Sequence, residues 1–342
     1  MRAADHARDV VGLYGDPTVA WSILLRATPT EPVVQSDISQ RLAACVRQHP
    51  WLGAPPSVES FDDGVAERFA CTPYTDGEPL VRIAVGDEVV IAAHHGAVDG
   101  LGLLALLGTT LNATVTSNAA GVGRRRGGES FARSALRRLG EAVFAPPTRI
   151  EPSARHESAA EVLLHKDIPR VRAGTATLTV AALRATESWN QEHGAPADRV
   201  VAAVGASRRS GGDLRPEHDS AFFRLPLSAG TDPAAVHTLM RGRPPEPDFP
   251  ATRNPVMSLG IRALAPRLGS TFLMSNLGVV DAPVSSLAFH PAASGRSGVA
   301  FGAVTVGQTT TLTVRARGRD FDAVSAMNLL ELLISELPDA AR

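Results

Sequence analysis

Two adjacent histidines, His94 and His95, end an apolar run and are followed by Asp99 and Gly100. Imidazole titrates near neutral pH, so a histidine in such a place can take a proton from a hydroxyl or an amine as that group attacks. Burying two imidazoles at the end of a strand is costly unless they are hydrogen-bonded or used in chemistry. This stretch is therefore the first candidate for a functional site.

Three interpretations of the stretch are open. The first is structural, with a hydrogen-bonded core histidine and with Asp99 as a helix N-cap. The second is a metal site, because two histidines and an aspartate are plausible ligands. Adjacent strand residues point to opposite faces, however, so His94 and His95 cannot easily hold one ion. No other histidine or acidic cluster supplies a convincing third and fourth ligand.

The third interpretation, an acid–base site, fits the pattern better. One histidine would face the site, and its neighbour would face the protein interior and stabilise the turn. Asp99 would hold the turn in shape, paired with a buried arginine. Gly96 and Gly100 allow tight backbone geometry, and the amide after the histidine could face a developing oxyanion.

The first half of the chain must position this stretch. Its apolar patterns predict strands at 19–28, 80–85 and 88–94 and helices at 36–49 and 101–111. Gly86-Asp87 would join the two later strands in a type II′ turn, because glycine comes first in a two-residue link. Ser36-Asp37 would cap the first helix, which ends before Pro50.

The second half is predicted to be a similar mixture. Strands are expected at 160–165, 200–206, 222–227, 271–274, 286–290, 299–306 and 309–317, and helices at 131–143, 179–193 and 322–337. We expect an N-terminal lobe at 1–118, a connector at 119–157 and a C-terminal lobe at 158–342. The connector holds the arginine run 124–126, which we interpret as a solvated linker, and residues 244–255 are proline-rich and irregular.

The two halves also contain an internal echo. In each, a hairpin with a glycine-first turn leads into a helix, once through residues 94–100 and once through residues 316–322. The second copy has no histidine. This pattern predicts two related lobes with a single active site.

Composition narrows the functional class. The chain has 342 residues, of which 20% are charged, and a net charge of −1, which gives no electrostatic case for nucleic acid or an anionic membrane. Cys45 and Cys71 do not make a disulfide framework, so a reducing cytoplasm is the expected location. We expect no signal peptide and no membrane span. The G-x-S-x-G elbow, the dinucleotide loop and the P-loop are not present in the sequence.

The heptapeptide from His94 to Gly100 matches an HHxxxDG motif, and through it the chain resembles the chloramphenicol acetyltransferase-like superfamily. That superfamily includes nonribosomal peptide synthetase condensation domains, polyketide-associated acyltransferases, alcohol acetyltransferases and wax ester synthases. Three other segments agree with it: His49-Pro50-Trp51-Leu52 with the HPxL element, Gly174 and Thr177 with the start of the long helix, and Ser275-Asn276-Leu277-Gly278 with the SNLG turn.

The resemblance implies an α/β (α+β) fold. Two lobes, each a mixed sheet flanked by helices, would pack in a V with a central tunnel. His95, the second histidine, would be the catalytic base. Asp99 would be structural and tied to an arginine, for which the candidates are Arg26, Arg208 and Arg209. His94, Gly96 and Gly100 would support the motif, and Ser275 and Asn276 would lie near the tunnel.

The resemblance also implies a stand-alone acyltransferase, placed in natural-product biosynthesis. It would move an acyl group from a coenzyme A or carrier-protein thioester to a small alcohol or amine, without a metal or bound organic cofactor. An acyl or peptidyl carrier protein is thus an expected partner. The alternative is a non-acylating scaffold, such as a cyclase or a recruiting module. It is motivated by missing length between residues 232 and 255 and by Asp219-Ser220, where the family commonly has glycine-asparagine.

Overall fold

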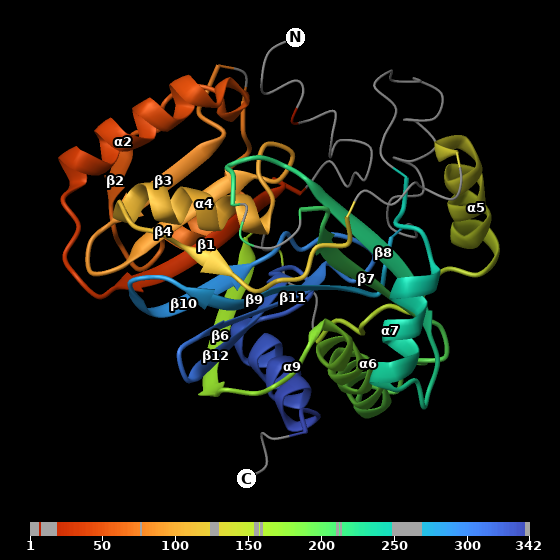
Figure 1. Cartoon of the computed structure of the whole chain (residues 1–342). Coiled ribbons are helices and arrows are strands. Elements are labelled where there is room, and N and C mark those ends of the chain that lie inside the picture. The colour runs from red at the N-terminus through yellow and green to blue at the C-terminus, as the bar shows by residue number, and fades with distance from the viewer. Residues whose placement is uncertain are drawn as a thin grey trace.

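The computed structural model describes residues 7, 19–75, 77–123, 130–153, 157, 160–209, 212, 214–247 and 269–338. Within these ranges the chain forms two mixed sheets flanked by helices, which confirms the predicted fold class (Figure 1). The arginine run 124–126 and the proline-rich residues 248–255 lie outside the described residues.

The first sheet carries the histidine motif at the end of a central strand. In the described part of the chain its order is β10-β1-β4-β3-β2, and only β2 and β3 run parallel. Its strands are β1 (Ser22–Pro29), β2 (Val58–Ser60), β3 (Val81–Val85), β4 (Val89–His94) and β10 (Val284–His290). Because β4 lies between β1 and β3 with helices on both faces of the sheet, each of its residues is buried.

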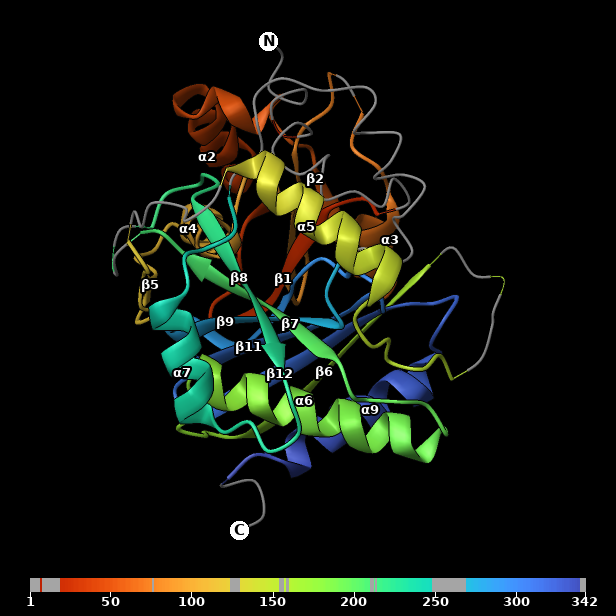
Figure 2. The ribbon, with the colours of Figure 1, turned by 90° about the vertical axis from the view of Figure 1, so that its right-hand side faces the viewer.

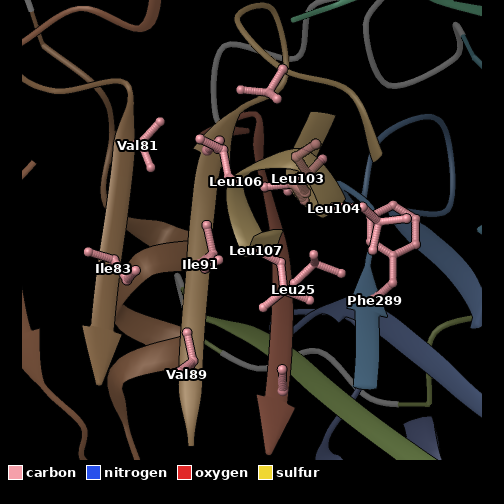
Figure 3. Packing of buried hydrophobic residues seen from close by; sticks show 14 of the residues in the cluster. Leu25, Val81, Ile83, Val89, Ile91, Leu103, Leu104, Leu106, Leu107 and Phe289 are labelled. Carbon is pink, nitrogen blue, oxygen red and sulfur yellow. The ribbon is translucent and has the colours of Figure 1, made fainter. Parts of the chain in front are cut away.

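Helices cover both faces of this sheet. They are α2 (Gln35–Gln48), the 3-10 turn η1 (Pro50–Leu52), α3 (Val65–Cys71) and α4 (Gly100–Leu111). On one face, leucines of α4 pack over Leu25 and Ile91, with Phe289 of β10 beside them (Figure 3). On the other face, α3 places Phe69 against Val90. The first helix differs from the prediction, because it begins before Ser36 and has no side-chain cap.

The second sheet belongs mainly to the C-terminal half. Among the described residues its order is β6-β12-β11-β9-β7-β8, and β5 also pairs with β9. Its strands are β5 (Thr116–Ser117), β6 (Glu161–Pro169), β7 (Val200–Ser207), β8 (Ser220–Leu227), β9 (Phe272–Asp281), β11 (Val299–Val306) and β12 (Thr309–Arg317). Helices α6 (Thr175–Glu192), α7 (Pro233–Gly242) and α9 (Ala323–Ser335) supply side chains to one core on this sheet. Helix α5 (Phe131–Phe144) lies on the opposite side of β7 and β8 from α6 (Figure 2).

Strands from each half enter the sheet of the other. β10 pairs with β1, and β5 pairs with β9. Fully buried Arg315 of β12 adds a further link, because it pairs with Glu161 and donates a hydrogen bond to the Ser22 carbonyl at 2.5 Å. The division at 1–118, 119–157 and 158–342 stays a prediction, and these contacts cut across it.

The two hairpins have turns of different length, although the sequence predicts a two-residue turn for both. Val306 pairs with Thr309, and Gly307 has a φ of 55°, as a glycine-first two-residue turn requires. Val85 pairs with Val89, so three residues lie in the first turn. Gly86 is not among the residues with positive φ, and the type II′ prediction is therefore wrong there.

Two short helices were also missed by the sequence reading. They are α3, whose last residue is Cys71, and α7, which lies between the strand predicted at 222–227 and the proline-rich residues 244–255. In the part of the chain that the structure describes, no helix is both long and apolar enough to cross a membrane.

Candidate active site

A cavity of about 1180 Å³ lies where the two halves of the molecule meet. Trp21 and His95 line it from the N-terminal half, and strands β7, β8 and β9 line it from the C-terminal half. Parts of α5, α6 and α7 complete the wall. A pocket of this size can hold a ligand larger than a single small metabolite.

His94 faces away from this cavity. Its side chain is buried, and its ring meets that of Tyr74 edge-on with the centroids 5.3 Å apart. Its Nδ1 accepts a hydrogen bond from the Gly96 amide at 3.1 Å. His94 thus stabilises the turn, and the Gly96 amide is already engaged. The prediction that this amide faces an oxyanion is therefore wrong.

His95 lies on the cavity wall. Its backbone amide donates to the Trp21 carbonyl at 2.7 Å, and Trp21 adopts a left-handed φ of 55°, a strained conformation for a tryptophan. The His95 Nδ1 atom lies 3.3 Å from the Val98 carbonyl oxygen. A carbonyl can only accept, so Nδ1 carries the hydrogen in the neutral ring and Nε2 keeps its lone pair. The ring is therefore held in the tautomer that a base requires.

The surroundings of His95 favour its neutral form. Burial first, and then the neighbouring His218, lower the pKa of His95 to about 4. The Val98 carbonyl and the Asp99 carboxylate oppose this shift, with smaller effects on the pKa. At neutral pH the ring is thus unprotonated, and Nε2 can accept a proton.

Asp99 joins the two halves of the molecule beside His95. Its buried carboxylate caps α4 by accepting from the Gly102 amide at 2.8 Å. The same carboxylate forms an ion pair with buried Arg209 and accepts from the Asp219 amide at 3.1 Å. Leaving a buried carboxylate uncompensated is costly, and these bonds remove that cost.

The structure thus distinguishes the three arginines proposed as partners of Asp99. Arg209 is the partner. Arg26 pairs instead with Glu88, and Arg208 lies on the cavity wall. The periodicity of the sequence could not identify the partner of Asp99, because Arg209 comes from the other half of the chain.

The segment 214–219 crosses from the C-terminal half onto the histidine motif. Arg209 donates to the Arg215 carbonyl at 2.7 Å, and the Asp99 amide donates to the Glu217 carbonyl at 3.2 Å. The Trp51 indole, within the HPxL-like element, donates to the Pro216 carbonyl at 2.8 Å. These bonds fix the segment that carries His218.

His218 is a cavity residue that the sequence analysis missed. Its Nδ1 lies 2.7 Å from the His95 carbonyl oxygen, and the two rings stand edge-on with their centroids 5.2 Å apart. The one feature of the sequence that could have indicated it is a histidine two residues before β8, a strand in which buried and more exposed residues alternate. In the sequence, the following Asp219-Ser220 is notable only as a departure from the family pattern.

The motif glycines provide space rather than unusual dihedral angles, since neither Gly96 nor Gly100 has a positive φ. A Cβ atom at Gly96 would lie 2.0 Å from the Ala7 carbonyl oxygen, and one at Gly100 would lie 2.7 Å from Leu277. At Gly96 the neighbour is backbone, so only glycine allows this approach, whereas a side chain at Gly100 would require the end of the Leu277 side chain to shift.

Ser275 and Asn276 line the cavity from the middle of β9. The Asn276 side chain accepts from the Gly278 amide at 2.8 Å and contacts Thr175, at the start of α6, at 3.4 Å. The SNLG segment is thus part of a strand and not a turn, with Gly278 at a φ of 75°. The roles of both residues stay predictions.

Other candidate groups do not converge on the site. Among the described residues, no three histidine, cysteine, aspartate or glutamate side chains are arranged to hold a metal ion. His94 and Asp99 are directed to Gly96 and Arg209, away from a shared point with His95. Burial raises the pKa of both cysteine thiols, Cys45 and Cys71, which favours the unreactive protonated form.

Comparison with solved structures identifies the fold. The first condensation domain of the calcium-dependent antibiotic synthetase, in complex with a substrate analogue, matches with a TM-score of 0.62 at 14% identity, over 98% of this chain and 95% of that one. The starter condensation domain of rhizomide synthetase in complex with C8-CoA gives 0.59 at 12% identity, over 97% and 92%. The epimerization domain from the third module of tyrocidine synthetase B gives 0.50 at 11% identity, over 97% and 95%.

The chain therefore has the condensation-domain fold, which bears out at the level of fold the resemblance inferred from the HHxxxDG motif. The match covers both lobes, because nearly the whole of each chain is included. No protein-family model matches the sequence, and no curated protein matches it.

Proposed function

We propose that this chain is an acyltransferase that moves an acyl group from a thioester to a small amine or alcohol. One observation carries the proposal: His95 presents a neutral ring, with its basic Nε2 atom left free by the Val98 contact, on the wall of a large cavity between the lobes. The shared fold with a domain in complex with C8-CoA supports a thioester donor.

In the proposed reaction the acceptor attacks the thioester carbonyl beside His95. The His95 Nε2 atom takes the proton that the nucleophile loses, and a new carbon–nitrogen or carbon–oxygen bond forms. The carbon–sulfur bond then breaks, and the thiolate takes the proton from His95. The products are an amide or ester and a free thiol, and the imidazole returns to its neutral form.

Negative charge on the carbonyl oxygen needs a stabilising group, and the Gly96 amide is engaged elsewhere. Gly100 and Leu101 line the cavity in the first turn of α4. Amides in a first helical turn have no acceptor within the helix, and the helix dipole favours negative charge there. We assign this turn to the developing oxyanion.

The donor carries its own activated carbonyl, so the proposed reaction uses no bound organic cofactor or metal. Coenzyme A and a carrier-protein phosphopantetheine present the same thioester and are both proposed donors. A role in natural-product assembly, as a stand-alone cytoplasmic enzyme, belongs to the same proposal.

Product mass tests the proposal. The protein is incubated with a panel of acyl-coenzyme A thioesters and acyl-loaded carrier proteins, each with a panel of amines and alcohols. We expect free thiol and an acylated acceptor in equal amounts, both lost in His95→Ala. If no combination releases thiol above the uncatalysed rate, the acyltransferase proposal is refuted.

A non-acylating role is the second candidate. The observation that favours it is the match to an epimerization domain, which has the same fold at a TM-score of 0.50. A substrate altered by wild-type protein but not by His95→Ala, without release of thiol, would favour this candidate.

A further inference from the structure

We propose that the end of the cavity remote from His95 binds a carboxylate, and that Arg224 of β8 is the residue that holds it. The ligand is an extended chain with its reacting group at one end and the carboxylate at the other. The chain belongs to the acyl group or to the acceptor, so this inference rests on the proposed acyl transfer. It assigns a ligand-binding role to a residue outside the HHxxxDG motif.

Strand β8 runs along the cavity wall from the candidate base to Arg224. Alternate residues of a strand share a face, and Ser220, Phe222 and Arg224 all line the cavity. The Ser220 end lies beside the base, because His218, two residues earlier, has its ring 5.2 Å from that of His95 between centroids. Four residues of an extended strand span about 13 Å. The wall thus offers a path of about that length from the base to a guanidinium.

The path between these two ends suits an extended apolar chain. The residues of β7 that pair with these three positions of β8 are small and also line the cavity: they are Ala203, Gly205 and Ser207. Small side chains project little from a sheet, and Phe222 supplies an apolar surface between the two ends. The cavity wall therefore presents a base, an apolar stretch and a cation in that order.

An ion pair fixes the Arg224 guanidinium from outside the cavity. Its Nη1 atom lies 2.5 Å from Oε2 of Glu141 on α5, the helix that lies over β7 and β8 (Figure 2). Its Nη2 atom donates to the Gly269 carbonyl at 3.2 Å. Glu141 is not among the residues that line the cavity, whereas Arg224, whose side chain is 11% exposed, is one of them. The guanidinium is therefore preorganised before a ligand binds, which lowers the entropy cost of binding.

The same guanidinium keeps hydrogen-bond donors for a ligand. It has five N–H groups and no acceptor. In the described part of the chain its hydrogen-bond acceptors are Glu141 and the Gly269 carbonyl, which leaves donors unused. Burial lowers the pKa of Arg224, and the Glu141 carboxylate opposes this shift. A partly desolvated cation with spare donors is best satisfied by an anion that accepts hydrogen bonds, and a carboxylate matches its planar geometry.

The other carboxylates near this end of the cavity are already paired. Glu246 also acts on Arg224, and it accepts hydrogen bonds from Ser134 and Arg138 of α5 at 3.0 and 2.7 Å. Among the described residues, Asp99 and Glu246 are the acidic side chains that line the cavity, and each forms an ion pair with an arginine. An incoming carboxylate thus meets arginine side chains without an unpaired carboxylate beside them.

Removing both charges of the ion pair separates ligand binding from folding. Arg224→Gln alone would leave Glu141 without its partner, so the test variant combines Arg224→Gln with Glu141→Gln. The matched control combines Arg184→Gln with Glu336→Gln, because that ion pair does not line the cavity. Arg224→Lys keeps the charge and loses the planar fork. It is the second variant if the double replacement does not fold.

The kinetic test compares ligands that differ only at the far end, a carboxylate against the corresponding primary amide. One arm varies the acyl thioester and the other varies the amine acceptor, each over a series of chain lengths. We expect wild type and the control to prefer the carboxylate once the chain spans about 13 Å. The arm that shows the preference identifies the substrate that carries the carboxylate.

The double variant should lose this preference by roughly 10- to 100-fold, the size of a hydrogen bond to a charged group, and Arg224→Lys should keep part of it. The loss should appear in KM with kcat unchanged, because the carboxylate is remote from the bonds that change. A merely structural role of Arg224 would lower activity toward the carboxylate and the amide alike, at every chain length.

Calorimetry measures the same contact without catalysis. The probes are an amino carboxylate and a dicarboxylate of the preferred length, with no thioester present. We expect wild type and the control to bind one of them more tightly than its amide, and the double variant to bind both forms equally weakly.

The outcomes distinguish this inference from the function on which it rests. Equal kcat/KM for carboxylate and amide at every chain length, or an unchanged preference in the folded variants, overturns the role of Arg224 and leaves acyl transfer standing. An equal rise in KM for all coenzyme A thioesters would assign Arg224 to the phosphates of the donor and also overturn it. Carboxylate binding that depends on Arg224, without thiol release from any substrate, would overturn acyl transfer alone.

Discussion

The molecule contains the same strand–turn–helix unit twice, and only one copy holds the candidate site. After β4, the amides of Ala97 and Val98 donate to the His94 carbonyl at 2.8 and 3.2 Å. After β12, the amides of Asp320 and Phe321 donate to the Arg317 carbonyl at 2.9 and 3.0 Å. The backbone hydrogen bonds of the two turns therefore match residue by residue.

The N-caps that follow these turns match as well. Asp99 accepts from the Gly102 amide at 2.8 Å, and Asp322 accepts from the Ser325 amide at 2.7 Å. Asp99 is buried and joined to Arg209, whereas Asp322 is exposed. The same backbone turn is thus purely structural after β12, whereas after β4 it also supports the candidate site.

Two features distinguish the turn that holds the site. The position after the strand is His95 in the first turn and Gly318 in the second. In addition, only the first turn is crossed by the segment 214–219, which brings Arg209 and His218 to it. The two turns share a backbone, and the copy with the candidate site differs by His95 and by the contacts that the other lobe makes with it.

The largest expected effect is the loss of activity on removal of His95. We expect His95→Ala to lower kcat/KM for acyl transfer by roughly 10²- to 10⁴-fold, the usual contribution of a positioned base. Arg319→Ala, which changes an exposed side chain in the matching turn, should leave activity unchanged. Steady-state kinetics on variants with wild-type thermal unfolding midpoints checks both, and equal activity of the two variants would remove the functional difference between the turns.

The two capping aspartates should differ in their contributions to stability. Asp99→Ala removes a cap and leaves the Arg209 guanidinium buried without its carboxylate, so we expect a loss of about 3–5 kcal/mol in the free energy of unfolding. Asp322→Ala removes an exposed cap and should cost about 1 kcal/mol. Urea denaturation measures both. Similar losses would mean that the ion pair with Arg209 adds little to the first cap.

The amides of Gly102 and Ser325 bond to the two capping aspartates, and replacing each of these residues with the other's type should have a smaller effect on stability. A Cβ atom at Gly102 would lie 2.8 Å from the Glu217 carbonyl oxygen, beneath the segment that carries His218. Gly102→Ser should therefore cost about 1–3 kcal/mol and displace that segment. Ser325→Gly should cost only about 1 kcal/mol, through helix propensity. Thermal unfolding and activity are measured together, and a Gly102→Ser protein with wild-type activity would contradict the close packing described here.

Local patterns predicted the parts of the structure that depend on neighbouring residues. Alternation and helical periodicity located most strands and helices, and the HHxxxDG spacing identified the turn and the Asp99 cap. The short helix α7 was missed although Asp232 and Pro233 form a recognisable start, with an N-cap followed by proline. The Gly86 turn was misread because the residue type alone does not fix the register of a hairpin.

The contacts between the two halves could not be predicted from the sequence. Arg209 lies 110 positions from Asp99, and His218 lies 123 positions from His95. Three arginines were equally good partners for Asp99 until the folding of segment 214–219 over the motif distinguished them. Likewise, the sequence places β10 among the strands of the second half, whereas in the structure it pairs with β1 and completes the first sheet.

The ring of His95 provides the most direct test of the account, because the proposed chemistry requires a neutral imidazole with a basic Nε2 atom. Nitrogen NMR of histidine-labelled protein reports both the tautomer and the titration, and comparison with His95→Gln assigns this ring among the 10 histidines. We predict a hydrogen on Nδ1, none on Nε2, and protonation only as the pH falls to about 4. A hydrogen on Nε2 at neutral pH, or titration near the ordinary histidine value of about 6.5, would contradict the account.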